Sequence, residues 1–462
     1  MNFALLASLA IGTIIFLAAA FIAEYSNDFL VIALSFLIVI PPALIAVLKE
    51  VRDIFSPLKI YTYVLIVSSP LFSVYVYYFA DSWKYDYALF WQSFHELTPG
   101  IVLISFATIS MIIGYLVTGS NAFKPKPSLV SAYYSRVKLR LAAYSVLLIS
   151  MVAGLMFALD VNYAATLADN VMARKSIHEA SVGVSVRGSA LTHWRFLGVN
   201  LPHAMIIVFF TLVWLKKVRS SQHDLILLGV IFLVSCFIPF IASSRTPILE
   251  ILVVLVMIRH YLVRRVAMHK LLLVGFLFMM VIGTLGELRR NPDNFNFASV
   301  TNSVDSIVAS QYFVDLGKTS VVVNRVPSQV DYLYGSSLAT IAFAFVPRQI
   351  WPDKPIVRIG YFVGQNIIKL NNQTGIPPGF IAEIYLNFGY WGIFPVFFLL
   401  GMLIARLYNG VRREANYVTT VAYVVSIVTV TLSLLATDLT YALLQALFYF
   451  VPIAVITRVV RR

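Results

Sequence analysis

About a dozen long apolar segments, separated by short charged loops, constrain the fold of this chain more than any other feature. An α-helix needs roughly 20 mostly apolar residues to cross a bilayer. Of the 462 residues, 60% are hydrophobic, whereas soluble domains are about 45–50% apolar. The alternating pattern of membrane β-strands is absent. We therefore predict an all-α polytopic membrane protein with about 12 transmembrane helices.

The predicted spans follow one another along most of the chain, apart from two long gaps. They are residues 3–23, 30–48, 60–79, 100–119, 141–159, 201–215, 225–242, 247–262, 271–288, 391–408, 417–437 and 441–458. The first span has no charged segment before it, so we expect a retained helix rather than a cleaved signal peptide. The single cysteine, Cys236, lies inside a span, which excludes an intrachain disulfide.

Positive charge is divided unequally between alternate loops, and this division predicts the orientation. With a cytoplasmic N-terminus, the cytoplasmic segments hold 21 of the 35 lysines and arginines but 4 of the 21 acidic residues. Short loops rich in lysine and arginine stay in the cytoplasm. We therefore predict that both termini are cytoplasmic. The net charge of +14 then reflects topology, and no nucleic-acid partner is expected.

Two predicted outer segments are too long to be simple connectors. The first is the loop 160–200, which lies within a region of nine transmembrane helices, residues 1–288. The second is a large outer loop, residues 289–390, and residues 391–462 supply the last three helices. The large loop is rich in aromatic residues, and its apolar stretch from Leu338 to Val346 is too short to span. We expect that stretch to form a re-entrant or interfacial helix.

Arginine is favoured over lysine on the outer side, nine to five. Because arginine binds phosphate in a bidentate way and stays charged, this bias indicates a site for a polyanion such as a diphosphate. The alternative for each residue is a side chain that reaches the lipid headgroups. The candidates among these arginines are Arg174, Arg187, Arg245, Arg289 and Arg290.

Two proline-punctuated motifs close the large loop. In VPRQIWPDKP (346–355), Arg348 and Lys354 lie in a turn that could present both cations to one site; an aromatic anchor through Trp351 is the alternative. In IPPGFIAEIYLNFGYWGIF (376–394), Glu383 is the only acidic residue, at the mouth of a span. Such a residue is a candidate general base. The alternative is a structural glutamate that is paired with an arginine or held at a helix N-terminus.

These motifs resemble those of the Wzy-type oligosaccharide repeat-unit polymerases, which polymerise O-antigen, enterobacterial common antigen and capsule units. The likeness rests on VPRQIWPDKP, on Ser244-Arg245 opening a span, and on one conspicuous run. The run comprises Pro378, Gly379, Glu383, Tyr385, Asn387, Phe388 and Gly389. The span number and the large outer loop agree with this resemblance.

The resemblance implies a GT-C-like inverting glycosyltransferase in the bacterial inner membrane. Its donor and acceptor would be undecaprenyl pyrophosphate-linked oligosaccharides at the periplasmic face, with membrane lipid around it and a chain-length regulator protein as a further partner. Glu383 would be the base, and the outer cations, Tyr385 and Asn387 would bind substrate. No cofactor motif and no metal-ligand spacing are present, so none is expected. A flippase or transporter of lipid-linked sugars and an O-antigen ligase remain alternatives.

Overall fold

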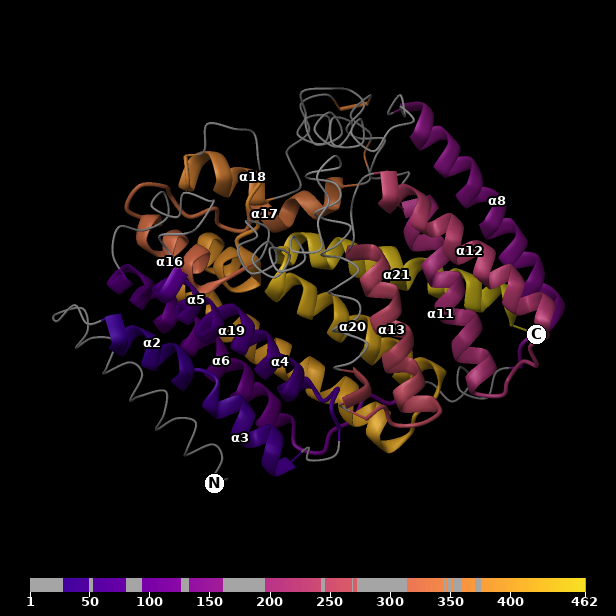
Figure 1. Ribbon diagram of the computed structural model, residues 1–462, viewed down its shortest axis with the longest axis horizontal. Helices are drawn as coiled ribbons and strands as arrows, with labels where there is room; N and C mark the ends of the chain where they lie inside the picture. Colours follow the sequence, from indigo (N-terminus) through magenta and orange to yellow (C-terminus); the bar gives the residue numbers. More distant parts are fainter. Residues whose placement is uncertain are drawn as a thin grey trace.

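A computed structural model describes most of the chain, and its ribbon is shown in Figure 1. The described residues are 28–49, 53–79, 94–125, 133–160, 196–241, 246–267, 269–271, 314–344, 346, 350–351, 359–369 and 375–461. The predicted span 3–23 lies outside these residues, as does the predicted span 271–288 apart from its first residue.

The described part of the chain is built from helices, with η marking short 3₁₀ or π turns. The first elements are α2 (Asp28–Leu37), α3 (Ile40–Lys49), α4 (Pro57–Ile66), η1 (Val67–Leu71), α5 (Phe72–Phe79), η4 (Phe94–Leu97), α6 (Thr98–Thr118) and α8 (Arg136–Asp160). Next come η5 (Phe196–Asn200), α11 (Leu201–Trp214), α12 (Gln222–Ile241) and α13 (Thr246–Leu262). The last are α16 (Leu316–Arg325), α17 (Ser336–Ala339), η8 (Thr340–Phe343), α18 (Ile359–Phe362), η9 (Val363–Ile367), α19 (Gly379–Arg413), α20 (Tyr417–Leu435) and α21 (Leu439–Val460).

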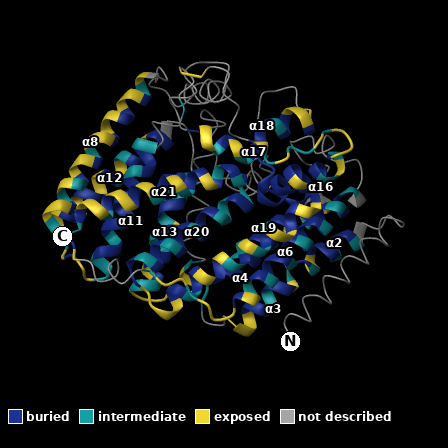
Figure 2. Cartoon of the chain, turned by 180° about the vertical axis from the view of Figure 1, so that it is seen from behind, coloured by how far each residue is buried: buried dark blue, intermediate teal, exposed yellow. Residues whose placement is uncertain are grey.

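Nine helical segments of the described residues are long and apolar enough to cross a membrane. They confirm an all-α polytopic membrane protein. Many of their outward side chains are large and apolar, and α8 shows this along its whole length, where exposed residues follow one face (Figure 2). Such a surface is stable in lipid rather than in water.

The helices pack as two groups that meet at α19 and α20. One buried cluster joins α2 to α6 with α16 and the first half of α19, and a second joins α8 and α11 to α13 with the second half of α19 and with α20 and α21. Figure 1 shows the early helices gathered around α19 on one side, and α8, α11 and α12 on the other. The helix α19 therefore contributes to both hydrophobic cores.

The contact between α6 and α19 depends on glycine. A Cβ atom built on Gly114 would overlap the carbonyl oxygen of Phe398, and one built on Gly401 would overlap the carbonyl oxygen of Met111. Small residues allow helix backbones to approach closely in membranes, where van der Waals packing drives association. The two glycines therefore hold α6 directly against the backbone of α19.

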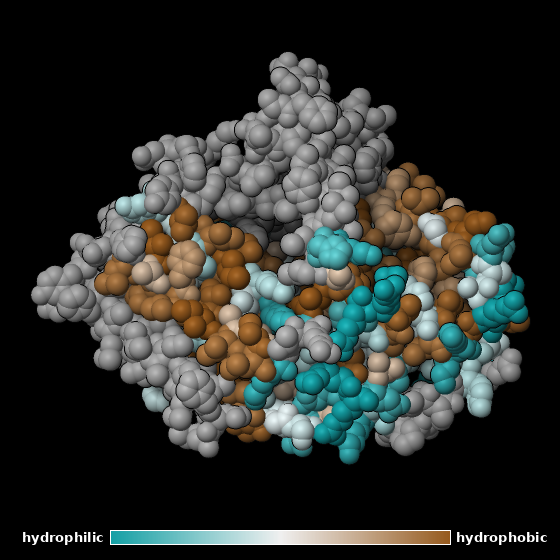
Figure 3. Space-filling view, turned by 60° about the horizontal axis from the view of Figure 1, so that its bottom comes forward, coloured by the Kyte–Doolittle hydropathy of each residue, from teal (hydrophilic) through white to brown (hydrophobic). Residues whose placement is uncertain are grey.

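The two ends of the bundle differ in character. The short elements α16, α17 and α18 lie together at one end, at the top of Figure 1, which we call the α16 end. The opposite end, called the basic end, comes forward in Figure 3 and shows a band of hydrophilic residues between hydrophobic flanks. Its basic residues include Lys49, Lys59, Arg136, Lys138, Arg140, Lys216, Lys217, Arg259, Arg406, Arg412, Arg413 and Arg458.

Asp53 organises a polar cluster at the basic end. Its carboxylate accepts hydrogen bonds from the Phe55 amide at 3.0 Å, the Tyr261 hydroxyl at 3.1 Å and the Tyr408 hydroxyl at 2.9 Å, and His260 Nε2 lies 3.3 Å away. Burial raises the pKa of the Asp53 carboxyl, but the hydrogen bonds from His260, Tyr408 and Phe55 outweigh burial and hold that pKa below its ordinary value. The charged carboxylate thus ties the α3–α4 loop to α13 and α19.

We expect Gly401→Ala to destabilise the protein by about 1–3 kcal/mol, because the added methyl group must push α6 and α19 apart. Thermal unfolding of the purified protein in detergent measures this as a lower Tm. The matched control is Gly229→Ala in α12, where a Cβ atom has nothing within 4 Å. An equal Tm for the two variants would contradict the close-packing argument.

Candidate functional site

The α16 end is built on the first turns of α19. Pro378 caps the helix, and Gly379 has φ 84°, a left-handed conformation that lets the chain turn sharply into it. A second break follows at Gly389, with φ 59°. The helix from Tyr390 onward matches the predicted span 391–408, and its two dozen or so residues would measure about 36 Å. That length already exceeds a hydrocarbon core of about 30 Å.

The turns before Gly389 therefore need not lie in the hydrocarbon core of the membrane. These turns carry three polar residues of the family-like run, Glu383, Tyr385 and Asn387. All three are buried, with exposed fractions of 0%, 4% and 0%. Each is buried because it binds another segment of the chain.

Glu383 joins three elements through its carboxylate. Oε1 accepts hydrogen bonds from the Ser337 hydroxyl of α17 at 2.9 Å and from the Thr440 hydroxyl of α21, and Oε2 accepts from the Thr440 amide at 3.1 Å. A buried carboxylate is tolerated when such donors replace its hydration. The N-terminus of α21 also favours a negative charge at this position.

Asn387 lies one helical turn after Glu383 in α19 and binds the turn that leads into α17. Its Nδ2 donates to Ser337 Oγ and to the Glu383 carbonyl oxygen, both at 2.8 Å, while its Oδ1 accepts from the Gly335 amide at 3.0 Å. The Tyr334 amide donates to the Asn387 carbonyl oxygen at 3.0 Å. One asparagine therefore satisfies most of the polar groups in the turn that leads into α17.

Tyr385 points toward a different part of the outer segment. Its hydroxyl donates to the Val326 carbonyl oxygen at 3.0 Å, directly after α16. Its ring packs edge-on against Tyr332 and Tyr390, with centroids 6.1 and 5.1 Å away. The three motif residues thus dock residues 326–340 onto the start of α19.

The short helix α16 is held by ionic and polar contacts of its own. Asp315 caps it by accepting from the Lys318 amide, and the buried Lys318 ammonium binds the same carboxylate. Ser320 donates to the Leu97 carbonyl oxygen at the start of α6. Arg325, which belongs to the outer arginines of the sequence, donates to the Ile367 carbonyl oxygen. In this position its guanidinium links α16 to η9.

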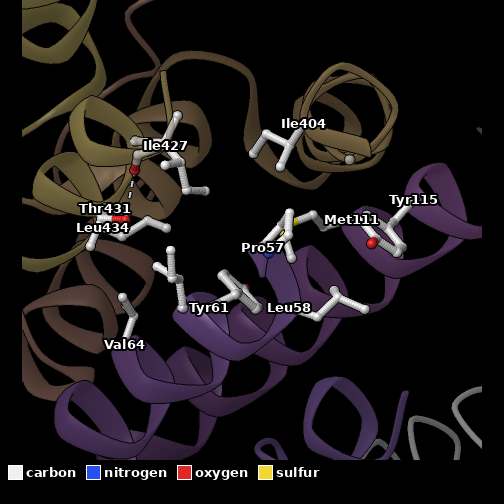
Figure 4. Close-up of a pocket in the computed structure, with 13 residues that line it drawn as sticks. Pro57, Leu58, Tyr61, Val64, Met111, Tyr115, Ile404, Ile427, Thr431 and Leu434 are labelled. Carbon is white, nitrogen blue, oxygen red and sulfur yellow. Dashed lines mark hydrogen bonds between the residues drawn. The ribbon is translucent and has the colours of Figure 1, made fainter. Parts of the chain in front are cut away.

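Two neighbouring cavities among the described residues are each too small for a sugar. The one drawn in Figure 4 lies between α4, α6, α19 and α20, has a volume of about 20 Å³ and is lined mainly by apolar side chains such as Tyr61 and Ile427. A volume of this size holds about one water molecule. A second cavity of the same size extends toward Asp315, and Leu434 lines both cavities. The polar chemistry therefore lies around Glu383 and not in these cavities.

All seven cations predicted to bind phosphate lie outside the described part of the chain. They are Arg174, Arg187, Arg245, Arg289, Arg290, Arg348 and Lys354. Within the described ranges there is no group of three or more histidine, cysteine, aspartate or glutamate residues that could hold a metal ion. The predictions for these cations stay predictions.

Two partners of Glu383, Ser337 and Thr440, were not predicted from the sequence. Both are small hydroxyl residues that follow ordinary turn signals, Gly335 before the first and Asp438 before the second. Their sequence separations from Glu383 are 46 and 57 residues. The one available signal was their position, because each is the second residue of a helix.

The fold and this network define a multi-pass α-helical membrane protein with a buried carboxylate centre at one end. The family model for the O-antigen polysaccharide polymerase Wzy matches residues 2–461. The chain belongs to this family, and its function is O-antigen repeat-unit polymerisation in polysaccharide biosynthesis. No curated protein and no solved structure matches it.

Replacing Asn387 by alanine is expected to release the docked turn. The change leaves the Gly335 amide without its acceptor and should cost about 1–3 kcal/mol. Hydrogen exchange, read by mass spectrometry, should become faster in residues 333–340. The control is Asn366→Ala, which removes an exposed amide that bonds within its own turn. Unchanged exchange in Asn387→Ala would show that other contacts hold the segment.

Proposed function

We propose that this protein polymerises undecaprenyl pyrophosphate-linked oligosaccharide repeat units at the periplasmic face of the bacterial inner membrane. It moves the growing chain from its lipid carrier to the next lipid-linked unit. The observation that carries the proposal concerns three residues of the family resemblance at a single end of the bundle. Glu383 and Asn387 share one hydrogen-bond network through Ser337, and Tyr385 docks the same outer segment through Val326.

The proposed orientation has both termini in the cytoplasm. It is supported by the basic end, which lies opposite the Glu383 network and gathers lysines and arginines from several loops. Positively charged short loops remain on the cytoplasmic side. The network then faces the periplasm, where the lipid-linked units are presented.

The proposed reaction is an inverting displacement without a metal ion. An acceptor hydroxyl attacks the anomeric carbon of the donor, and the bond from that carbon to the lipid pyrophosphate breaks. The diphosphate takes the electron pair, and Glu383 takes the proton of the hydroxyl. Cations stabilise the charge that develops on the diphosphate. We assign this role first to Arg245, Arg289, Arg290 and Arg348, with Arg174, Arg187 and Lys354 behind them.

The role of Glu383 as the general base can be tested with a variant that keeps its hydrogen bonds. In Glu383→Gln the amide oxygen can keep the bond from the Thr440 amide, and the new NH₂ group can donate to the Ser337 and Thr440 hydroxyls, which rotate to accept it. The fold should therefore survive while proton uptake is lost. We expect polymerisation in vitro to fall about 10²–10⁴-fold. The assay uses purified protein and lipid pyrophosphate-linked units, with chelator present because no metal is required.

The control is Glu414→Gln, the same change at an exposed residue of the basic end. Full-length polymer from a folded Glu383→Gln variant would remove Glu383 from the reaction. In cells, a strain without the gene should display core with a single repeat unit, or accumulate lipid-linked single units. Loss of every repeat unit from the surface would instead identify a flippase or a ligase.

A further inference from the structure

The proposed base, Glu383, has no direct path along which a proton can reach it from the surface. Glu383 has an exposed fraction of 0%, and both carboxylate oxygens already accept hydrogen bonds. An acceptor sugar therefore cannot contact the carboxylate directly in this arrangement. A proton can reach it only through one of the groups that donate to it.

Two hydroxyl groups donate to Glu383 Oε1, and they differ in access. Thr440 is fully buried at 0%, as is Asn387, whereas Ser337 keeps an exposed fraction of 6%. Ser337 is thus the least buried of these three residues. Its oxygen accepts one hydrogen bond, from Asn387 Nδ2 at 2.8 Å. A hydroxyl oxygen has two lone pairs, so one remains to accept a further hydrogen bond.

The surroundings of Ser337 suit a sugar. Tyr334, three residues earlier, is 79% exposed, and Phe388 is 39% exposed and lies against Gly335. Binding sites for small molecules combine aromatic walls with a few placed polar groups. Tyr334 and Phe388 therefore offer exposed aromatic surface beside the turn that leads to Ser337, on which a sugar ring can stack.

We propose that Ser337 is a proton relay between the acceptor sugar and Glu383. The acceptor O–H bond breaks, and its proton passes to Ser337 Oγ. In the same step the Ser337 hydroxyl proton passes along the 2.9 Å hydrogen bond to Glu383 Oε1. The acceptor oxygen forms its bond to the anomeric carbon, and the diphosphate leaves with the electron pair. The carboxyl later returns the proton to water by the reverse path. This inference rests on the proposed function.

Asn387 has a positioning role in this relay. By donating to Ser337 Oγ it leaves that oxygen able to donate to the carboxylate, and it orients the hydroxyl along the path. The Thr440 hydroxyl and amide hold the carboxylate from the other side. Ser337 therefore passes the proton, Asn387 orients the Ser337 hydroxyl, and Thr440 holds the carboxylate in place.

Single-turnover transfer by the full-length protein in lipid nanodiscs tests the relay. Ser337→Ala should lower the rate of the chemical step about 10²-fold or more and change substrate affinity less than about threefold. Ser337→Thr, which restores a hydroxyl, should recover activity. Ser336→Ala, at the exposed neighbour, is the matched control and should behave as the unaltered protein does. A folded Ser337→Ala variant with nearly full rate overturns the relay.

The number of protons transferred in the chemical step provides a second readout. A purely structural role of Ser337 would not affect this number. In mixtures of H₂O and D₂O, a relay moves two protons in one step, so the rate should depend on the deuterium fraction along a curve. A straight line, which indicates one proton, overturns the relay. An active Ser337→Ala with an inactive Glu383→Gln leaves the proposed function intact. An active Glu383→Gln removes the proposed base and the relay together.

Discussion

The structure of the α16 end depends on the cost of burying one carboxylate. A charged group taken out of water must be given hydrogen-bond donors, or it destabilises the fold by several kcal/mol. Glu383 obtains its donors from two distant segments, Ser337 before it and Thr440 after it. The outer segment and the last helix are therefore held at fixed positions relative to α19. The hydrogen bonds that offset the cost of burying the carboxylate therefore also keep the site rigid.

This rigidity needs a rigid support, which the helix pair α6 and α19 provides. Gly114 and Gly401 bring the two backbones into direct contact, and a buried apolar cluster surrounds them. The helix α19 then continues to the basic end, where Tyr408 donates to Asp53. One helix thus connects the candidate site with the polar cluster on the other side of the bundle.

The sequence predicted the parts of this architecture that depend on local composition. Apolar length located the nine spans that the described residues contain, and the start of the predicted span at residue 391 falls just after the break at Gly389. The isolated charge of Glu383 in an apolar run singled out the residue. Its partners could not be predicted, because hydrogen bonds across 46 and 57 residues depend on how the outer segment folds back. The predicted roles of the outer cations remain predictions, since all but Arg325 and the two lysines Lys318 and Lys369 lie outside the described residues.

Arg325 and Lys318 show why charge counting alone cannot assign a phosphate site. Both belong to the outer cations that the sequence sets apart. In the structure the Lys318 ammonium is buried against Asp315, and the Arg325 guanidinium binds a backbone carbonyl oxygen. Both cations therefore have a structural role within the protein, which their charge and position in the sequence do not reveal. Hydrogen bonding limits the Glu383 carboxylate in a similar way. Because both of its oxygens already accept hydrogen bonds, it can receive a proton only from a donor that in turn takes up another. Of the two residues whose hydroxyls bind Glu383, Ser337 is the less buried, with an exposed fraction of 6% against 0% for Thr440.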